Sequence, residues 1–98
     1  MLHTVNKSPF QNSSLESCMR FTQPGDVILL MEDGVYGAVS GTAKAPLVEA
    51  ALARKVRVCV LGADLKARAL NDTIKGTEIT DYAGFVDLVA ENKIHSWL

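Results

Sequence analysis

The sequence has little cysteine, little proline and no excess of charge of either sign. Only two of its 98 residues are cysteine and three are proline. Two cysteines are too few for the disulfide framework of a small secreted protein. The formal net charge of −1 argues against the basic surface on which dedicated nucleic-acid domains depend, so we expect no tight, direct nucleic-acid binding.

Long apolar runs are also missing. No stretch approaches the roughly 20 residues of a membrane span, and the first residues do not form a basic and apolar leader. We therefore expect a protein of the cytoplasm without a membrane anchor. The length predicts a single domain, 1–98. Hydrophobic residues make up 48% of this short chain, a share that favours a buried subunit surface, including a homo-oligomer of the isolated chain.

No common catalytic or phosphate-binding motif is present. Neither GxGxxG nor GxxxxGK(S/T) follows any apolar run, which disfavours dinucleotide enzymes and kinases. The GxSxG motif of serine hydrolases is absent as well. The two histidines, His3 and His95, show no spacing with the cysteines that is typical of a zinc site. We therefore expect no metal and no cofactor.

The chain is organised around the segment Gly25–Tyr36. Five apolar residues, Val27–Met31, run without a polar break and end at an acidic turn. A short apolar run bounded by turn residues is typical of a strand buried on both faces of a parallel sheet. Sites in such sheets lie beyond the carboxyl ends of the strands, so Glu32, Asp33 and Tyr36 are candidate site residues.

Strand and helix patterns alternate along the whole chain. The expected strands are Leu2–Val5, Val27–Met31, Val56–Leu61 and Thr77–Thr80, with Ile94–Leu98 as an edge strand or a docked end. The expected helices are Ser14–Phe21, one or two turns within Val35–Gly41, Pro46 to about Arg54, Asp64 through Leu70 and Tyr82 to about Asn92. Such alternation predicts an α/β fold, a three-layer α/β/α sandwich with a mostly parallel sheet of about four or five strands.

Helix caps and inner faces follow from the same patterns. Ser13 and Glu16 fit a capping box at the first helix, and Asp64 and Asp81 are expected to cap later helices. Apolar spacing then predicts the inward residues. These are Leu15, Cys18, Met19 and Thr22 in the first helix, Leu47, Ala50 and Ala51 in the Pro46 helix, and Tyr82, Phe85, Val86 and Val89 in the last.

The surroundings of the two cysteines predict packing. Cys59 lies between Val58 and Val60 in an expected strand, where a free cysteine behaves as a small buried hydrophobe. Cys18 falls beyond the first helical turn, in which a helix N-terminus favours negative charge. A thiol with an ordinary pKa of roughly 8.5 is mostly protonated at neutral pH, so the residues alone favour packing for Cys18 too.

The polar side chains at the strand ends allow two interpretations. Glu32 and Asp33 are adjacent and point in different directions, so they fit solvated turn residues better than an acid–base pair. Lys66 and Arg68 fit a solvated helix face. Alternatively, one set of side chains lines a cleft for a small ligand or another protein: Glu32, Asp33, Tyr36, Asp64, Lys66 and Arg68.

Several segments, in order and spacing, carry a resemblance that spans nearly the whole chain. They are LHTVNKSPF (Leu2–Phe10), SLESC (Ser14–Cys18), GDVILLMEDGVYGAV (Gly25–Val39), LGADLKARAL (Leu61–Leu70), ITDYAGFVDLV (Ile79–Val89) and the terminal Trp97. Together they resemble the DsrH/TusB family. The resemblance implies the DsrE-like α/β/α sandwich, in agreement with the pattern of strands and helices.

The same resemblance implies a subunit of a cytoplasmic persulfide sulfur-relay complex. Such a subunit joins DsrE/TusD-like and DsrF/TusC-like paralogues in a heterohexamer, which passes sulfur from an upstream donor to a small downstream carrier. In the Tus branch the sulfur reaches the wobble uridine of tRNA; in the Dsr branch the complex serves the oxidation of stored sulfur. The SLESC and HTVNKSPF segments resemble the Dsr branch, but the family pattern as a whole does not separate the two.

The resemblance also bears on the cysteines. In the family, the main sulfur-carrying cysteine lies in the DsrE/TusD-like partner, in the loop after its third strand. The corresponding segment here, Gly62–Arg68, contains no cysteine. Cys18 matches a cysteine that DsrH-type members carry in the first helix, which makes it a candidate sulfur acceptor. The chain is thus expected to be an accessory subunit that shapes its partner's cysteine pocket; the alternative is a non-redox binding module that uses the strand-end cleft.

Overall fold

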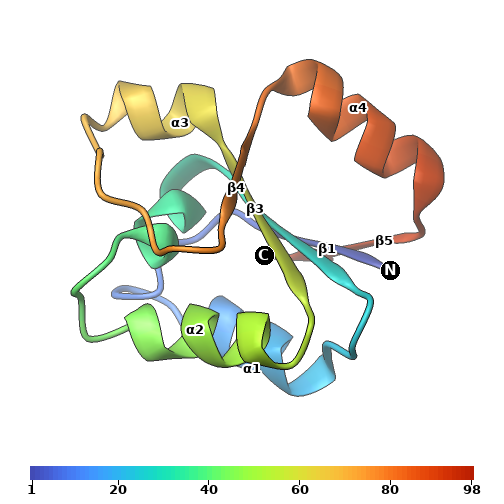
Figure 1. Cartoon of the computed structure of the whole chain (residues 1–98), viewed down its shortest axis with the longest axis horizontal. Coiled ribbons are helices and arrows are strands. Elements are labelled where there is room, and N and C mark those ends of the chain that lie inside the picture. Colours follow the sequence, from blue (N-terminus) through green and yellow to red (C-terminus); the bar gives the residue numbers. More distant parts are fainter.

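The computed structural model describes all 98 residues and places a parallel sheet between layers of helices (Figure 1). The five strands follow the order β4-β3-β2-β1-β5, and every neighbouring pair is parallel. They are β1 (Leu2–Val5), β2 (Val27–Leu30), β3 (Arg57–Leu61), β4 (Glu78–Thr80) and β5 (Ile94–Trp97). The expected α/β fold is confirmed, and the chain's last segment forms an edge strand.

The helices cover the two faces of the sheet unequally. They are α1 (Ser14–Phe21), the 3-10 helix η1 (Glu32–Ala38), α2 (Ala45–Ala53), α3 (Gly62–Ala67) and α4 (Tyr82–Glu91). α1 and α2 lie together on one face, and α4 lies across the other (Figure 1). None of these helices combines the length and the apolar composition that a bilayer crossing needs.

The core has the same asymmetry. The side that carries α1, α2 and η1 holds a cluster of 15 buried residues. The side under α4 holds only five, namely Leu2, Val27, Leu29, Cys59 and Leu88. β2 supplies side chains to both clusters, and none of its residues is more than 4% exposed, so the strand predicted to be enclosed on both faces is confirmed. α4, by contrast, is attached through few apolar contacts.

The predicted capping box is wrong. The Ser13 side chain makes no capping hydrogen bond; instead Asn12 Oδ1 accepts the backbone N–H of Ser14 at 2.7 Å. Glu16 does not reach back to the helix start, because its carboxylate pairs with Lys44 Nζ of the α2 region at 2.8 Å. A contact between two helices has replaced a contact within one. The cap predicted for α4 is confirmed, since Asp81 Oδ1 accepts the backbone N–H of Gly84 at 2.8 Å.

Two predicted inner faces need correction. In α2 the buried residues are Ala45, Val48 and Ala51; of the predicted three, Ala51 and Leu47 meet the core, whereas Ala50 is exposed. In α4 the only buried residue is Leu88, and Phe85 packs beside it. Both helices carry apolar residues on more than one side, so periodicity alone did not indicate which side meets the sheet. In α1 the prediction is confirmed, with Leu15, Cys18 and Thr22 buried and Met19 packed against the core.

Candidate functional site

The candidate site lies where β2 and β3 end. These strands are parallel neighbours, with Leu30 opposite Val60, so η1 and α3, which follow them, begin close together. η1 begins at Glu32, earlier than the predicted Val35. In η1 the backbone at Gly34 passes close to the end of β1, and only glycine fits there. A Cβ at this position would lie 2.1 Å from the carbonyl oxygen of Val5.

Four of the six predicted cleft residues form one network at this point. Arg68 donates from Nε to Asp33 Oδ1 at 2.9 Å and from Nη1 to the Asp64 carbonyl at 3.2 Å. Asp64 Oδ2 in turn accepts the backbone N–H of Glu32 at 2.7 Å. α3 starts at Gly62 and ends at Ala67. The prediction that Asp64 caps a helix running to Leu70 is therefore wrong, because its carboxylate holds the start of η1 instead.

The network works as a clamp on a strained turn. Glu32 has a φ of 49°, a left-handed conformation that costs a residue with a side chain roughly 1–2 kcal/mol. Its amide is held by Asp64. The Arg68–Asp33 pair is accessible to solvent, and such surface pairs contribute only about 0–1 kcal/mol. In this arrangement the network ties the start of η1 to α3 at the point where β2 and β3 end.

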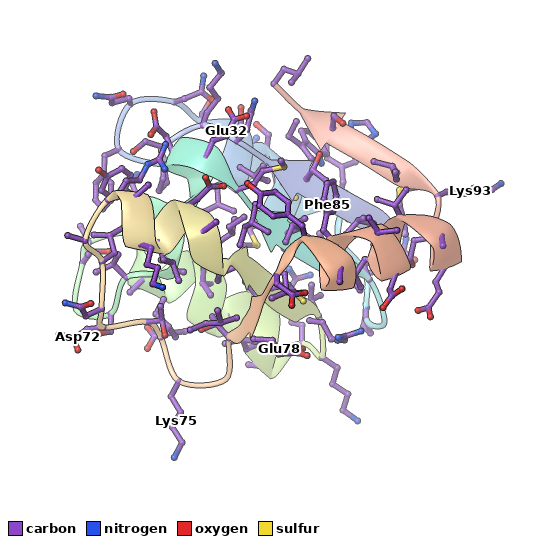
Figure 2. All side chains as sticks on the ribbon, turned by 90° about the horizontal axis from the view of Figure 1, so that it is seen from above. Glu32, Asp72, Lys75, Glu78, Phe85 and Lys93 are labelled. Atoms are coloured by element: carbon purple, nitrogen blue, oxygen red, sulfur yellow. The ribbon has the colours of Figure 1, made fainter.

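The other two predicted residues lie in separate hollows. Tyr36 shares with Asp33 a hollow of about 350 Å³ beside the loop after β1. Lys66 lines a larger cleft of about 840 Å³. In Figure 2, which looks down on α3 and α4, Glu32 and Glu78 lie on opposite sides of these helices. The predicted set is therefore divided among one clamp and two hollows.

The 840 Å³ cleft opens between α3 and the connection from β4 to α4. One wall runs from Gly62 to Asn71 and the other from Ile79 to Tyr82, and Lys66 and Asp81 are its charged members. Sequence reasoning missed the second wall, because Tyr82 was expected to face the sheet. The available signal was that β4 and β3 are successive strands, whose carboxyl ends meet at the same edge.

Both thiols lie in the core. Cys18 is 0% and Cys59 2% exposed. Burial, reinforced by the negative charge of Asp26, raises the pKa of Cys18 to about 12. Burial also raises the pKa of Cys59. The thiolate is the reactive form, and burial keeps Cys18 in the thiol form at pH 7.

No group of three or more histidine, cysteine, aspartate or glutamate side chains is arranged to hold a metal ion. The polar atoms at the strand ends instead satisfy one another, as the bonds from Arg68 and Asp64 show. The exception is Asn6, whose Oδ1 is buried without a hydrogen-bond partner.

Comparisons with known proteins extend over nearly the whole chain. A family model described as DsrH like protein matches residues 7–94. Protein TusB of Erwinia tasmaniensis is 39% identical and Protein TusB of Pectobacterium parmentieri 33% identical, each over 94% of both chains. Among solved structures, the ychN protein from E. coli superposes with a TM-score of 0.83 at 18% identity over 97% of both chains. MTH1491 from Methanobacterium thermoautotrophicum has a TM-score of 0.74 at 12% identity, over 97% of this chain and 96% of its own. At such identities the two structures support the fold alone.

Proposed function

The chain belongs to the DsrH/TusB family, and we propose on that basis that it is a subunit of a cytoplasmic sulfur-relay complex acting in 2-thiolation of the tRNA wobble uridine. One observation carries the proposal: proteins named TusB match 94% of the chain at 33% and 39% identity. The same match favours tRNA thiolation over the oxidation of stored sulfur, the function of the Dsr branch. The proposed partners are DsrE/TusD-like and DsrF/TusC-like subunits, joined with this chain in a heterohexamer that hands sulfur to a downstream carrier.

Within that complex the chain is an accessory subunit and not the main sulfur carrier. Two features support this role. The segment Gly62–Arg68, which corresponds to the cysteine loop of the DsrE/TusD-like partner, forms α3 and contains no cysteine. The chain's own thiols, Cys18 and Cys59, are both buried. What the strand ends offer is a rigid clamp and an open cleft, which suit contact with another subunit.

The role of Cys18 as a sulfur acceptor stays a prediction. The sulfur atom lies inside the larger core cluster, so a persulfide donor reaches it only if α1 separates from the sheet. The raised pKa of the thiol opposes the reaction in the folded state. The proposal therefore does not depend on this residue.

Deletion of the gene tests the proposal. We expect the deletion strain to lose 2-thiouridine from its tRNA, measured by mass spectrometry of digested nucleosides. A plasmid that carries the wild-type gene should restore 2-thiouridine, and so should a plasmid that carries the double variant Cys18→Ser with Cys59→Ala. Unchanged 2-thiouridine together with impaired oxidation of stored sulfur would move the chain to the Dsr branch. Copurification of the chain with its two paralogues is the second requirement.

The cleft favours a second candidate function, a non-redox binding module. Its volume of about 840 Å³ lies within the range of small-molecule sites, roughly 300–1,000 Å³. In that case both sulfur pathways should survive deletion of the gene. Loss of either pathway in the deletion strain would dismiss this candidate.

A further inference from the structure

His3 lies at the edge of the sheet between two polar partners. Its side chain is buried and, two residues before Val5, points to the same side of the sheet, the side of the larger core cluster. Nε2 of the ring lies 3.0 Å from Asp26 Oδ2, and Nδ1 accepts from the indole nitrogen of Trp97 at 3.1 Å. Both ring nitrogens are therefore occupied, although the ring is closed off from water.

These two contacts place different demands on the protonation of the ring. An ionised carboxylate only accepts hydrogen bonds, and an indole nitrogen only donates. The neutral ring satisfies both partners with its hydrogen on Nε2. A second proton has to bind Nδ1, where it faces the indole N–H of Trp97, donor against donor. Protonation of His3 thus breaks the hydrogen bond to Trp97, whereas the charged ring holds Asp26 more strongly than the neutral ring does.

The titratable groups around His3 come from three other parts of the fold. Asp26, in the turn before β2, has a lowered pKa because hydrogen bonds favour its charged form, and its second oxygen contacts the Met1 amine at 3.2 Å. On β5 the ring of His95 lies 6.2 Å from that of His3. On α1 the Cys18 thiol stays neutral, because burial raises its pKa to about 12. β2 itself is apolar, so Asp26 is the partner that a charged imidazole keeps.

Trp97 fastens the edge strand β5 to the body of the protein. β5 pairs with β1 alone (Figure 1), and its other residues, Ile94–Ser96, are exposed. Trp97 is the one side chain of this strand that packs against the larger core cluster, with its ring 5.5 Å from that of Phe21. Loss of the hydrogen bond to His3 therefore acts on the side chain that holds the strand in place.

We propose that His3 is a pH-sensitive latch, whose protonation in mild acid releases the Trp97 side chain and loosens β5 from β1. The latch belongs to the fold itself and goes beyond the proposed function, on which it does not depend. When β5 loosens, the outer backbone groups of β1 become free, and a sheet edge of this kind can accept another strand.

The fluorescence of Trp97, the chain's one tryptophan, reports the state of the latch. We expect a single transition between about pH 8 and 5.5, within the range in which histidine side chains titrate. His3→Gln should abolish the transition, because a glutamine amide can accept and donate but does not titrate. His95→Gln is the matched control: His95 is exposed with its ring 4.5 Å from that of Trp97, and its replacement should leave the transition in place.

Hydrogen exchange tests whether the strand loosens with the side chain. Exchange of the wild-type β5 amides, followed by mass spectrometry and corrected for the intrinsic effect of pH, should be about tenfold faster at pH 5.5 than at pH 8, the size expected for one lost buried hydrogen bond. β4, the opposite edge strand, is the internal control and should not change. Circular dichroism verifies the fold of each variant. Should His3→Gln not fold, NMR titration of the wild-type chain decides: the indole N–H signal of Trp97 has to follow the midpoint of His3 and not that of His95.

Three results would overturn the latch. The first is a wild-type chain whose fluorescence shows no transition. The second is a transition that persists in His3→Gln or disappears only in His95→Gln, because its source is then the Met1 amine or the exposed ring of His95. The third is equal exchange of β5 at both pH values, which would mean that the strand stays docked whatever the state of the ring. None of these results bears on tRNA thiolation, so the proposed function stands or falls separately.

Discussion

The indole N–H of Trp97 donates a hydrogen bond to Nδ1 of His3 at 3.1 Å and so joins the last strand to the first. Indole nitrogen can only donate, so Nδ1 accepts and the hydrogen of the neutral ring sits on Nε2. That nitrogen lies 3.0 Å from Asp26 Oδ2. His3 is 3% exposed, which makes Trp97, His3 and Asp26 a polar link beneath the β1–β5 pair.

Loss of the indole donor should destabilise the fold. We expect Trp97→Phe to lower the free energy of unfolding by about 1–3 kcal/mol, because buried Nδ1 of His3 is left without a partner. Urea unfolding followed by circular dichroism measures the change. Ser96→Ala is the control, since its hydrogen bond with Thr4 is exposed and should matter by less than about 0.5 kcal/mol. Equal effects of the two changes would contradict the link.

The same link makes the free energy of unfolding depend on pH in the acid range. Burial tends to raise the pKa of Asp26, but hydrogen bonds from His3, the Gln23 amide and the N-terminal amine outweigh it, and the pKa is lowered. A carboxyl whose pKa is lower in the folded than in the unfolded chain stabilises the fold above its ordinary pKa. That stability is lost as the pH falls through the folded value. We expect the free energy of unfolding to decline from about pH 5 downward.

The contribution of Asp26 can be isolated by comparing pH profiles of unfolding. The pKa values of Glu16 and Glu78 are also lowered, each by a hydrogen bond from a neighbouring cation, so Asp26→Asn should flatten the acid slope only in part. Glu49→Gln, at a side chain without hydrogen bonds on α2, should keep the wild-type slope. An unchanged slope in Asp26→Asn would show that the ionised Asp26 carboxylate does not stabilise the folded chain.

Short-range signals predicted the fold well. The apolar run of β2 and the cap by Asp81 depend on neighbours in sequence, and both are confirmed. The capping box failed because Glu16 found Lys44, a partner 28 residues away that no local pattern reveals. The predicted inner face of α4 was wrong for a related reason. Apolar residues lie on two sides of this helix, so tertiary packing decides which side meets the sheet.

The candidate site was predicted in composition but not in arrangement. Sequence reasoning placed Asp33, Asp64 and Arg68 at strand ends, and the structure brings them together. It did not foresee that Asp64 would hold the backbone of Glu32, since a cap across two segments needs the register of β2 and β3. The unequal cover of the sheet was equally hidden, and with it the exposure of Tyr82, Val86 and Val89 on α4.

A glycine at the strained turn after β2 should stabilise the protein. Glu32 adopts a φ of 49°, and glycine enters this left-handed region without the steric cost of a Cβ. We expect Glu32→Gly to raise the free energy of unfolding by up to about 1 kcal/mol, measured in urea. Glu49→Gly inside α2 should instead lower it by roughly 1 kcal/mol. Destabilisation by both changes would mean that the Glu32 side chain stabilises the turn by more than its conformation costs.

The two buried thiols should react with a persulfide donor only after the chain unfolds. Cys18 and Cys59 are buried and both have raised pKa values, whereas persulfide transfer needs an accessible thiolate. We expect a persulfide donor to leave the folded chain at its original mass, and to add about 32 Da per sulfur once urea exposes the thiols. Intact mass spectrometry of the wild-type chain, Cys18→Ser and Cys59→Ala assigns any adduct to its residue. An adduct on the folded wild-type chain that disappears only in Cys18→Ser would establish Cys18 as a sulfur acceptor. It would also show that α1 opens far enough to admit a donor, so the accessory role would have to include carrying sulfur.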